Sequence, residues 1–229
     1  MIVAISGIKG SGKDTAAHML QYLLNSPRVF RSYFWYKLKI KFPKKWRIIS
    51  FAKPVKKVLS TILGVDVNRF NDRDFKENYF VQLDTFKIVE KYLLDDEDIL
   101  SDNKFIKLIK TGNPIPTNTW LSIRQLMQYF ATEVAQTYLG RKVWINSTLK
   151  TDKDVIVSDL RFKEEFNAVK EKNGIIIYIQ RDLAKPGTHA SEREMYELYT
   201  QSKFDYVINN NATLKDLFND LKEIWKVEK

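Results

Sequence analysis

Gly7-Ile-Lys-Gly-Ser-Gly-Lys13 follows directly on the apolar run Ile2–Ser6 and leads into a helix-forming segment at residues 15–24. Glycines let the backbone of such a loop wrap around phosphate groups with its N–H groups pointing inward. The N-terminus of the following helix adds the positive end of its dipole. Lys13 is then expected to reach the β- and γ-phosphates of a nucleotide. A strand, a glycine-rich loop and a helix in this order predict a P-loop nucleotide-binding protein.

Asp14 stands where a P-loop usually carries the serine or threonine that touches Mg²⁺, and Thr15 comes next. A carboxylate is a good oxygen ligand for Mg²⁺. We expect Asp14 either to bind the metal or to cap the helix, in which case Thr15 makes the phosphate contact. A second acid, Asp159, ends an apolar run at 155–158, as does the aspartate that holds Mg²⁺ beside a P-loop. ATP and Mg²⁺ are the expected cofactors, with Asp14 and Asp159 as metal ligands.

Five short β-branched runs alternate with longer helical stretches: Ile2–Ser6, 47–51, 155–158, Ile175–Gln180 and 206–208. Apolar strands that alternate with helices predict a parallel sheet covered on both faces. The predicted fold is therefore an α/β P-loop NTPase with a doubly wound, five-stranded parallel sheet. We expect one domain over residues 1–229. It would contain a helical insertion at 66–118, which binds the acceptor, and a lid at 182–193 that closes over the phosphates.

Positive charge is concentrated in one part of the chain. The net charge is +10, yet residues 28–57 hold eleven lysines and arginines and no acidic residue. Aromatic residues interleave with these cations, mostly within a basic aromatic insertion at 28–45. We favour a solvated insertion whose aromatic residues pack on the body of the protein. A surface for a polyanion is the alternative, so nucleic acid stays open as a less favoured partner.

Composition excludes several classes of site and location. The chain has no cysteine, which excludes disulfides, thiolate metal sites and cysteine nucleophiles. No apolar run approaches the about 20 residues that a membrane span needs. The N-terminus has neither the basic lead nor the length of a signal peptide. We expect a cytoplasmic protein that does not bind membranes.

Further motifs follow the loop in order: Ser50-Phe-Ala-x-Pro-x-Lys56, Ser122-x-Arg-x-Leu-Met-Gln128, Ala131-Thr-Glu133, Trp144, Asp159-x-Arg-Phe-x-x-Glu165 and His189-x-Ser-Glu192. Together they resemble the deoxynucleoside monophosphate kinases of bacteriophage type, a P-loop nucleoside monophosphate kinase family, over nearly the whole chain. The family usually has glycine where Ala131 stands, and residues 28–45 look like extra sequence. The resemblance implies the strand order 2-3-1-4-5 and ATP-dependent phosphorylation of deoxynucleoside monophosphates to diphosphates. A homodimer stays open, and a phage-encoded protein would act in the host cytoplasm.

Residues 122–138 read as an amphipathic helix. Its apolar residues recur at helical spacing and predict a core-facing stripe: Ile123, Leu126, Met127, Phe130, Val134 and Tyr138. Arg124, Gln128 and Thr132 recur every four residues along a neighbouring stripe. An arginine, an amide and a hydroxyl in line suit the phosphate and base edge of a nucleotide. A solvated polar face is the alternative.

Asp159 and Arg161 project past the end of a buried strand, where ligands bind in open α/β sheets. The planar guanidinium of Arg161 suits a phosphate, and Glu165 could accept from Arg161 or from the substrate base. Trp144 would stack on the base or belong to the core, and the resemblance implies an acceptor-phosphate arginine at Arg73.

The expected catalytic residues are Lys13, Arg124 and Arg161. The expected ATP-binding residues are Gly7, Gly10, Ser11, Gly12, Lys13, Asp14, Thr15 and Arg181. The expected substrate-binding residues are Arg73, Arg124, Gln128, Ala131, Thr132, Trp144, Asp159, Arg161 and Glu165.

Two other functions stay open. One is a kinase for another small phosphate such as phosphomevalonate, because the Gly-Lys-Asp variant of the loop also resembles that family. The other is a nucleic-acid-binding P-loop ATPase that uses residues 28–57. Trp144 and the polar helical stripe favour the nucleoside monophosphate as acceptor.

Overall fold

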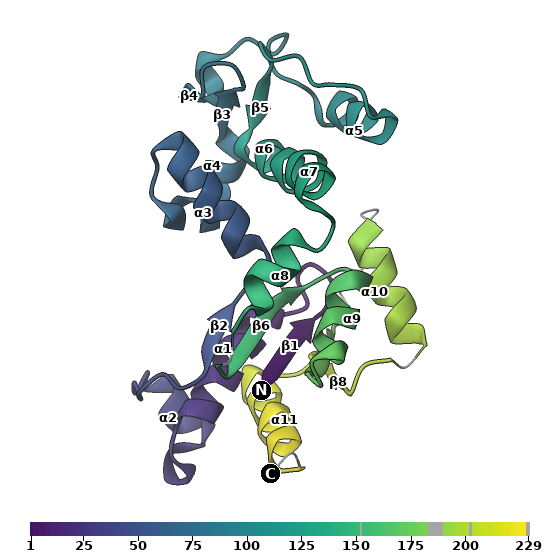
Figure 1. Cartoon of the computed structure of the whole chain (residues 1–229). Coiled ribbons are helices and arrows are strands. Elements are labelled where there is room, and N and C mark those ends of the chain that lie inside the picture. Colours follow the sequence, from purple (N-terminus) through teal and green to yellow (C-terminus); the bar gives the residue numbers. More distant parts are fainter. Residues whose placement is uncertain (152, 183–189, 202, 228–229) are drawn as a thin grey trace. The chain divides into compact units, whose positions relative to one another are not determined.

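The computed structural model describes residues 1–151, 153–182, 190–201 and 203–227, and for residues 190–194 and 227 it describes the backbone alone. The chain divides into two compact units (Figure 1). Unit 1 comprises Met1–Phe51 and Thr148–Lys229, and unit 2 comprises Ala52–Ser147. Residues 66–118, predicted as an insertion, lie wholly within unit 2. In the part of the chain that the structure describes, no helix is long and apolar enough to cross a bilayer.

Unit 1 is built on a parallel sheet in the order β2-β6-β1-β7-β8. The strands are β1 (Ile2–Ser6), β2 (Arg47–Ile49), β6 (Val155–Leu160), β7 (Ile175–Gln180) and β8 (Tyr206–Asn209). All five residues of the central strand β1 are buried, because a parallel strand covered by helices on both faces has no solvent side. Counted in chain order, the strands lie 2-3-1-4-5. The predicted α/β fold and its strand order are confirmed.

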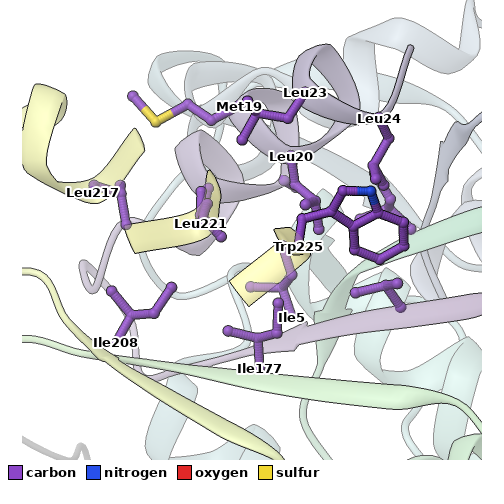
Figure 2. Packing of buried hydrophobic residues seen from close by; sticks show 14 of the residues in the cluster. Ile5, Met19, Leu20, Leu23, Leu24, Ile177, Ile208, Leu217, Leu221 and Trp225 are labelled. Atoms are coloured by element: carbon purple, nitrogen blue, oxygen red, sulfur yellow. The ribbon is translucent and has the colours of Figure 1, made fainter. Parts of the chain in front are cut away.

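The helices of unit 1 are α1 (Lys13–Asn25), α2 (Tyr33–Lys37), α9 (Lys163–Glu171), α10 (Ala190–Thr200) and α11 (Leu214–Val227), with a 3₁₀ turn at Arg28–Phe30. Apolar side chains of α1 and α11 interlock over the sheet (Figure 2): Met19, Leu20, Leu23, Leu24, Leu217, Leu221 and Trp225. A capping box begins α11, since the Thr213 hydroxyl accepts from the backbone N–H of Asp216, whose carboxylate accepts from the backbone N–H of Thr213.

The aromatic residues of the basic insertion divide between packing and exposure. The rings of Tyr33 and Tyr36 lie 5.8 Å and 5.5 Å from the ring of Phe218 in α11. Directly after the insertion, Trp46 is buried, and its ring lies 5.6 Å from that of Trp225. These contacts attach the insertion to the hydrophobic core, as the favoured interpretation predicts for these side chains.

Unit 2 contains a three-stranded antiparallel sheet, β4-β3-β5, formed by β3 (Tyr79–Gln82), β4 (Ile88–Glu90) and β5 (Trp120–Ser122). Its helices are α3 (Ala52–Leu63), α4 (Arg73–Asn78), α5 (Asp102–Thr111), α6 (Ile123–Tyr129) and α7 (Thr137–Leu139), with 3₁₀ turns at Val67–Asn71 and Lys91–Leu93. Helix α8 (Val143–Leu149) crosses the chain boundary between the units. The sequence analysis predicted helices for 66–118 and missed this sheet, whose strands are only three or four residues long.

A π-helix at Phe130–Gln136 follows α6 and changes the face that the chain buries. Ile123 and Leu126 are buried as predicted, whereas Tyr138 is 81% exposed and its prediction as a core residue was wrong. Each π turn accommodates more than the 3.6 residues of an α turn, so the α-helical spacing no longer locates the buried face beyond it. Ala135 is the buried residue of this segment instead.

Candidate active site

The glycine-rich loop connects β1 to α1 in unit 1 with little room around its backbone. Gly7, Gly10 and Gly12 all have positive φ angles, 151°, 84° and 93°. A Cβ atom on Gly7 would lie 2.5 Å from the Ser11 Oγ and 2.6 Å from the carbonyl oxygen of Ile179 in β7. A side chain at Gly7 would therefore have to displace the backbone of a neighbouring strand.

Two buried polar side chains mark the interior of this loop. Lys13 is the first residue of α1 and is only 8% exposed, which is unusual for a lysine. Ser11 is fully buried, and among the described residues its hydroxyl has no hydrogen-bond partner. A buried hydroxyl without a partner costs free energy that a ligand oxygen can recover. The loop therefore fits a phosphate group.

The turns after β7 and β8 hold the loop from the other side. The Asn210 side-chain amide donates to the carbonyl oxygen of Ser11 at 2.8 Å, and its backbone N–H donates to Gln180 at 2.8 Å. Arg181 donates to the carbonyl oxygen of Gly10 at 3.4 Å. Sequence reasoning named Arg181 but missed Asn210, because an asparagine in a turn is common. Its place directly after the last parallel strand was the available signal.

Asp14 and Asp159 are both in unit 1, at the first turn of α1 and within β6. The N-cap of α1 is Gly12, without a side-chain hydrogen bond, so Asp14 does not cap this helix. The Asp159 Oδ1 accepts from the backbone N–H of Phe51 at 2.8 Å. The described residues contain no cluster of three or more possible metal ligands. Mg²⁺ is commonly held by one or two carboxylates together with substrate phosphates, so these two acids fit such a site.

Glu165 stabilises the turn that carries Arg161. Its Oε2 accepts from the backbone N–H groups of Arg161 and Phe162, at 2.7 Å and 3.1 Å. Burial raises the pKa of Glu165 to about 8, and the charge of Asp159 adds to this, while the two N–H donors act against it. The side chain of Arg161 is exposed. Glu165, predicted to accept from Arg161 or from the substrate base, contacts the backbone at the start of α9.

Unit 2 brings together two arginines that the sequence analysis named separately. The Arg73 Nε lies 3.2 Å from the Glu77 Oε2, and the Arg124 Nη2 lies 2.9 Å from the Glu77 Oε1. Arg73 is on α4 and Arg124 on α6, and Glu77 belongs to α4. One carboxylate thus bridges two guanidinium groups. No sequence pattern pointed to Glu77, because its role depends on the packing of two helices.

Two lysines enlarge this positive cluster. The Lys56 Nζ donates to the Asn71 side chain at 2.8 Å, and the Lys76 Nζ donates to the Asn71 carbonyl oxygen at 3.5 Å. Burial lowers the pKa of Lys76, and the charges of Arg124 and Lys56 lower it further. The charges of Glu77 and Asp72 act against this shift, and a bound anion would reduce the repulsion among the cations further. The cluster of Lys56, Arg73, Lys76 and Arg124 therefore fits an anionic group.

The other substrate residues predicted in unit 2 make local contacts. Trp144 donates from its indole nitrogen to the carbonyl oxygen of Ala131 at 2.9 Å and packs beside Phe130 in the core of unit 2. The Thr132 hydroxyl donates to the carbonyl oxygen of Gln128 at 2.7 Å. The side chains of Gln128 and Thr132 are exposed. For Trp144, these contacts match the core alternative rather than an open stacking surface.

Most of the predicted lid at 182–193 lies outside the described residues, because the description breaks off after Asp182 and resumes at Ala190. His189 lies outside them.

Asn210→Ala removes one hydrogen bond that holds the glycine-rich loop. A hydrogen bond contributes about 1 kcal/mol, so the Kd for ADP should rise about fivefold in isothermal titration calorimetry. Asn211→Ala is the matched control, because Asn211 contacts Asp182 and Asn209 instead of the loop. Equal ADP affinities in the two variants would contradict this role of Asn210.

Comparison with known proteins identifies the family. Residues 1–221 match the family described as deoxynucleotide monophosphate kinase. The chain is 26% identical over 205 residues to the deoxynucleoside-5'-monophosphate kinase of Escherichia phage T5, covering 76% of this chain and 73% of that protein. It is 24% identical over 252 residues to the deoxynucleotide monophosphate kinase of Enterobacteria phage T4, covering 99% of each. Among solved structures, a shikimate kinase from Acinetobacter baumannii aligns over 100% of this chain and 94% of its own, with 13% identity and a TM-score of 0.42. The chain belongs to the deoxynucleotide monophosphate kinase family.

Proposed function

We propose that this kinase transfers the γ-phosphoryl group of ATP to the phosphate of a deoxynucleoside monophosphate through the residues described above. An oxygen of the acceptor phosphate attacks the γ-phosphorus, and the bond from that phosphorus to the β–γ bridging oxygen breaks, giving ADP and the deoxynucleoside diphosphate. The observation that carries this proposal is the glycine-rich loop with its buried Ser11 and Lys13. Family membership supports ATP as the donor and a deoxynucleoside monophosphate as the acceptor.

The donor side would be formed by unit 1. Backbone N–H groups of the loop and the N-terminus of α1 would hold the ATP phosphates. Lys13 would offset charge that develops on the β- and γ-phosphates, and Arg161 would do the same from the turn after β6. Glu165 would keep the backbone of Arg161 in place through its two hydrogen bonds. Fixed charges of this kind cost no reorganisation during the reaction.

Asp14 and Asp159 are the proposed ligands of Mg²⁺. The bound ion would neutralise phosphate charge in the complex with ATP. A carboxylate at Asp14 close to a triphosphate would be strongly repelled without a cation between them, which supports the metal role.

The acceptor side would be formed by unit 2. Arg73 and Arg124, with Lys56 and Lys76 beside them, would bind the acceptor phosphate. Glu77 would position the two guanidinium groups while the site is empty, because it contacts both. Gln128 and Thr132 would meet the base from the same side of the helical segment that carries Arg124. Trp144 would then support this wall from the core, through its bond to Ala131.

The other functions considered from the sequence lose support. A phosphomevalonate kinase would share the Gly-Lys-Asp loop, but the family match extends over residues 1–221. A P-loop ATPase without a small acceptor would not need the cluster of cations around Glu77. A deoxynucleoside monophosphate kinase accounts for both features.

Arg124→Ala tests the acceptor side. A hydrogen bond to a charged group contributes about 1.5–3 kcal/mol, so the KM for the acceptor should rise tenfold or more while the KM for ATP changes much less. The measurement is ADP release with dAMP, dCMP, dGMP and dTMP in turn. Arg141→Ala, which removes an exposed cation elsewhere in unit 2, is the control. The proposal fails if none of the four monophosphates raises ADP release by the wild-type enzyme.

Asp14→Asn tests the metal site, because it keeps the size of the side chain and removes its charge. Since Asp14 makes no cap, thermal stability should barely change, while the Mg²⁺ concentration for half-maximal rate should rise several-fold. Asp14→Ser restores the common P-loop residue and should recover much of the defect. Superimposable Mg²⁺ titrations of wild type and Asp14→Asn would refute the metal role.

A further inference from the structure

The positive charge of the basic insertion lies away from the proposed reaction. Helix α1 begins at the glycine-rich loop and ends at Asn25, so its 13 residues separate the loop from the insertion by about 20 Å. The Asn25 side chain then makes two hydrogen bonds with the backbone of Trp46. Strand β2 begins at Arg47, opposite Val155, which in turn lies opposite Ile2. The insertion therefore lies where the strands begin, whereas the phosphate cradle lies where β1 ends.

Eight exposed cations gather at this end of unit 1, and we call them the amino-edge basic surface: Arg28, Lys37, Lys39, Lys41, Lys44, Lys45, Arg47 and Lys153. Within the described part of the chain, one of these cations forms an ion pair: the Lys45 Nζ lies 3.6 Å from the Asp154 Oδ2. A cavity of about 380 Å³ is lined by five residues of this region: Lys44, Lys45, Arg47, Lys153 and Asp154. Substrates bound at the opposite edge cannot neutralise this charge, because at about 20 Å it is largely screened by salt.

Three large apolar side chains are exposed among these cations: Val29, Phe34 and Leu38. Helix α2 turns Tyr33 and Tyr36 inward onto Phe218, and it leaves Phe34 64% exposed. The ring of Phe34 lies 5.1 Å from that of Trp35, edge to face, which holds it in place. A binding site for single-stranded nucleic acid combines such an aromatic platform with a cationic groove. Membrane binding by a helix needs a broad free apolar face, whereas α2 has only five residues and packs two of its aromatic rings, Tyr33 and Tyr36, on Phe218.

We propose that the amino-edge basic surface binds single-stranded nucleic acid, independently of the kinase reaction. The cations contact backbone phosphates, and Phe34 stacks on a base. The cavity beside Lys45 accommodates a phosphate group, since four of its five lining residues are cationic. The enzyme would thereby be held on a polynucleotide while its active site stays open to mononucleotides.

The test is fluorescence anisotropy of a fluorescein-labelled 20-nucleotide oligothymidylate with the full-length enzyme, in saturating MgADP so that the P-loop is occupied. We expect binding that weakens with NaCl, with a log–log slope of about −0.7 per phosphate contact. Replacing Lys37, Lys39, Lys41, Lys44 and Lys45 together by glutamine should weaken binding at least tenfold and flatten that slope. The matched control replaces five exposed lysines of unit 2, Lys87, Lys104, Lys107, Lys110 and Lys142, and should bind like the wild type.

Phe34→Ala separates stacking from charge. It should weaken binding of the oligothymidylate about fivefold or more and leave binding of heparin unchanged, because heparin offers no base. The two five-lysine variants and Phe34→Ala should all keep the kcat of the kinase reaction, which also shows that they are folded. The proposal is overturned if the wild type does not bind the oligonucleotide at 50 mM NaCl, or if the control variant loses as much affinity. Tighter binding to duplex DNA or to anionic phospholipid vesicles would equally overturn it.

Discussion

The fit of the glycine-rich loop between β1 and β7 is the constraint on which the rest of unit 1 depends. The carbonyl oxygen of Ile179, in β7, leaves no room for a Cβ atom at Gly7. Ser6 is fully buried and donates to the carbonyl oxygen of Leu160, which ties the end of β1 to β6. The loop therefore starts from a fixed point between two strands. Asn210 holds the loop from the far side. The backbone N–H groups of the loop are therefore in position before a nucleotide binds.

The two units differ in the charged side chains that they bring together. Unit 1 surrounds its loop with a buried lysine and two carboxylates, which suits a triphosphate with a divalent cation. Unit 2 places two arginines on Glu77 and two lysines on Asn71, which suits a smaller anion without a metal. Glu77 also makes the unliganded cluster tolerable, since like charges at such distances repel one another. An incoming phosphate would take over the contacts that Glu77 makes.

Sequence patterns predicted the parallel sheet because its short β-branched runs alternate with longer helical stretches. The five strands followed from these runs, their order followed from the family resemblance, and the cradle followed from its glycines. Tyr138 was predicted wrongly because a π-helix breaks the spacing on which the prediction rested. The strands β3, β4 and β5 escaped notice because they are short and their pairing is set by tertiary contacts. Glu77 acts across two packed helices, so no local pattern could reveal it. For Asn210 the available signal was its place directly after the last parallel strand.

The most direct test of the account compares ADP binding by Gly7→Ala and Gly10→Ala in isothermal titration calorimetry. Both glycines have positive φ, but a Cβ on Gly10 meets no atom within 4 Å. Backbone strain of about 1–2 kcal/mol should weaken ADP binding to Gly10→Ala by roughly tenfold. Gly7→Ala should lose more than a hundredfold, because its methyl group displaces Ser11 or Ile179. Equal affinities of the two variants, or near wild-type affinity of Gly7→Ala, would contradict the proposal that this loop geometry creates the phosphate site.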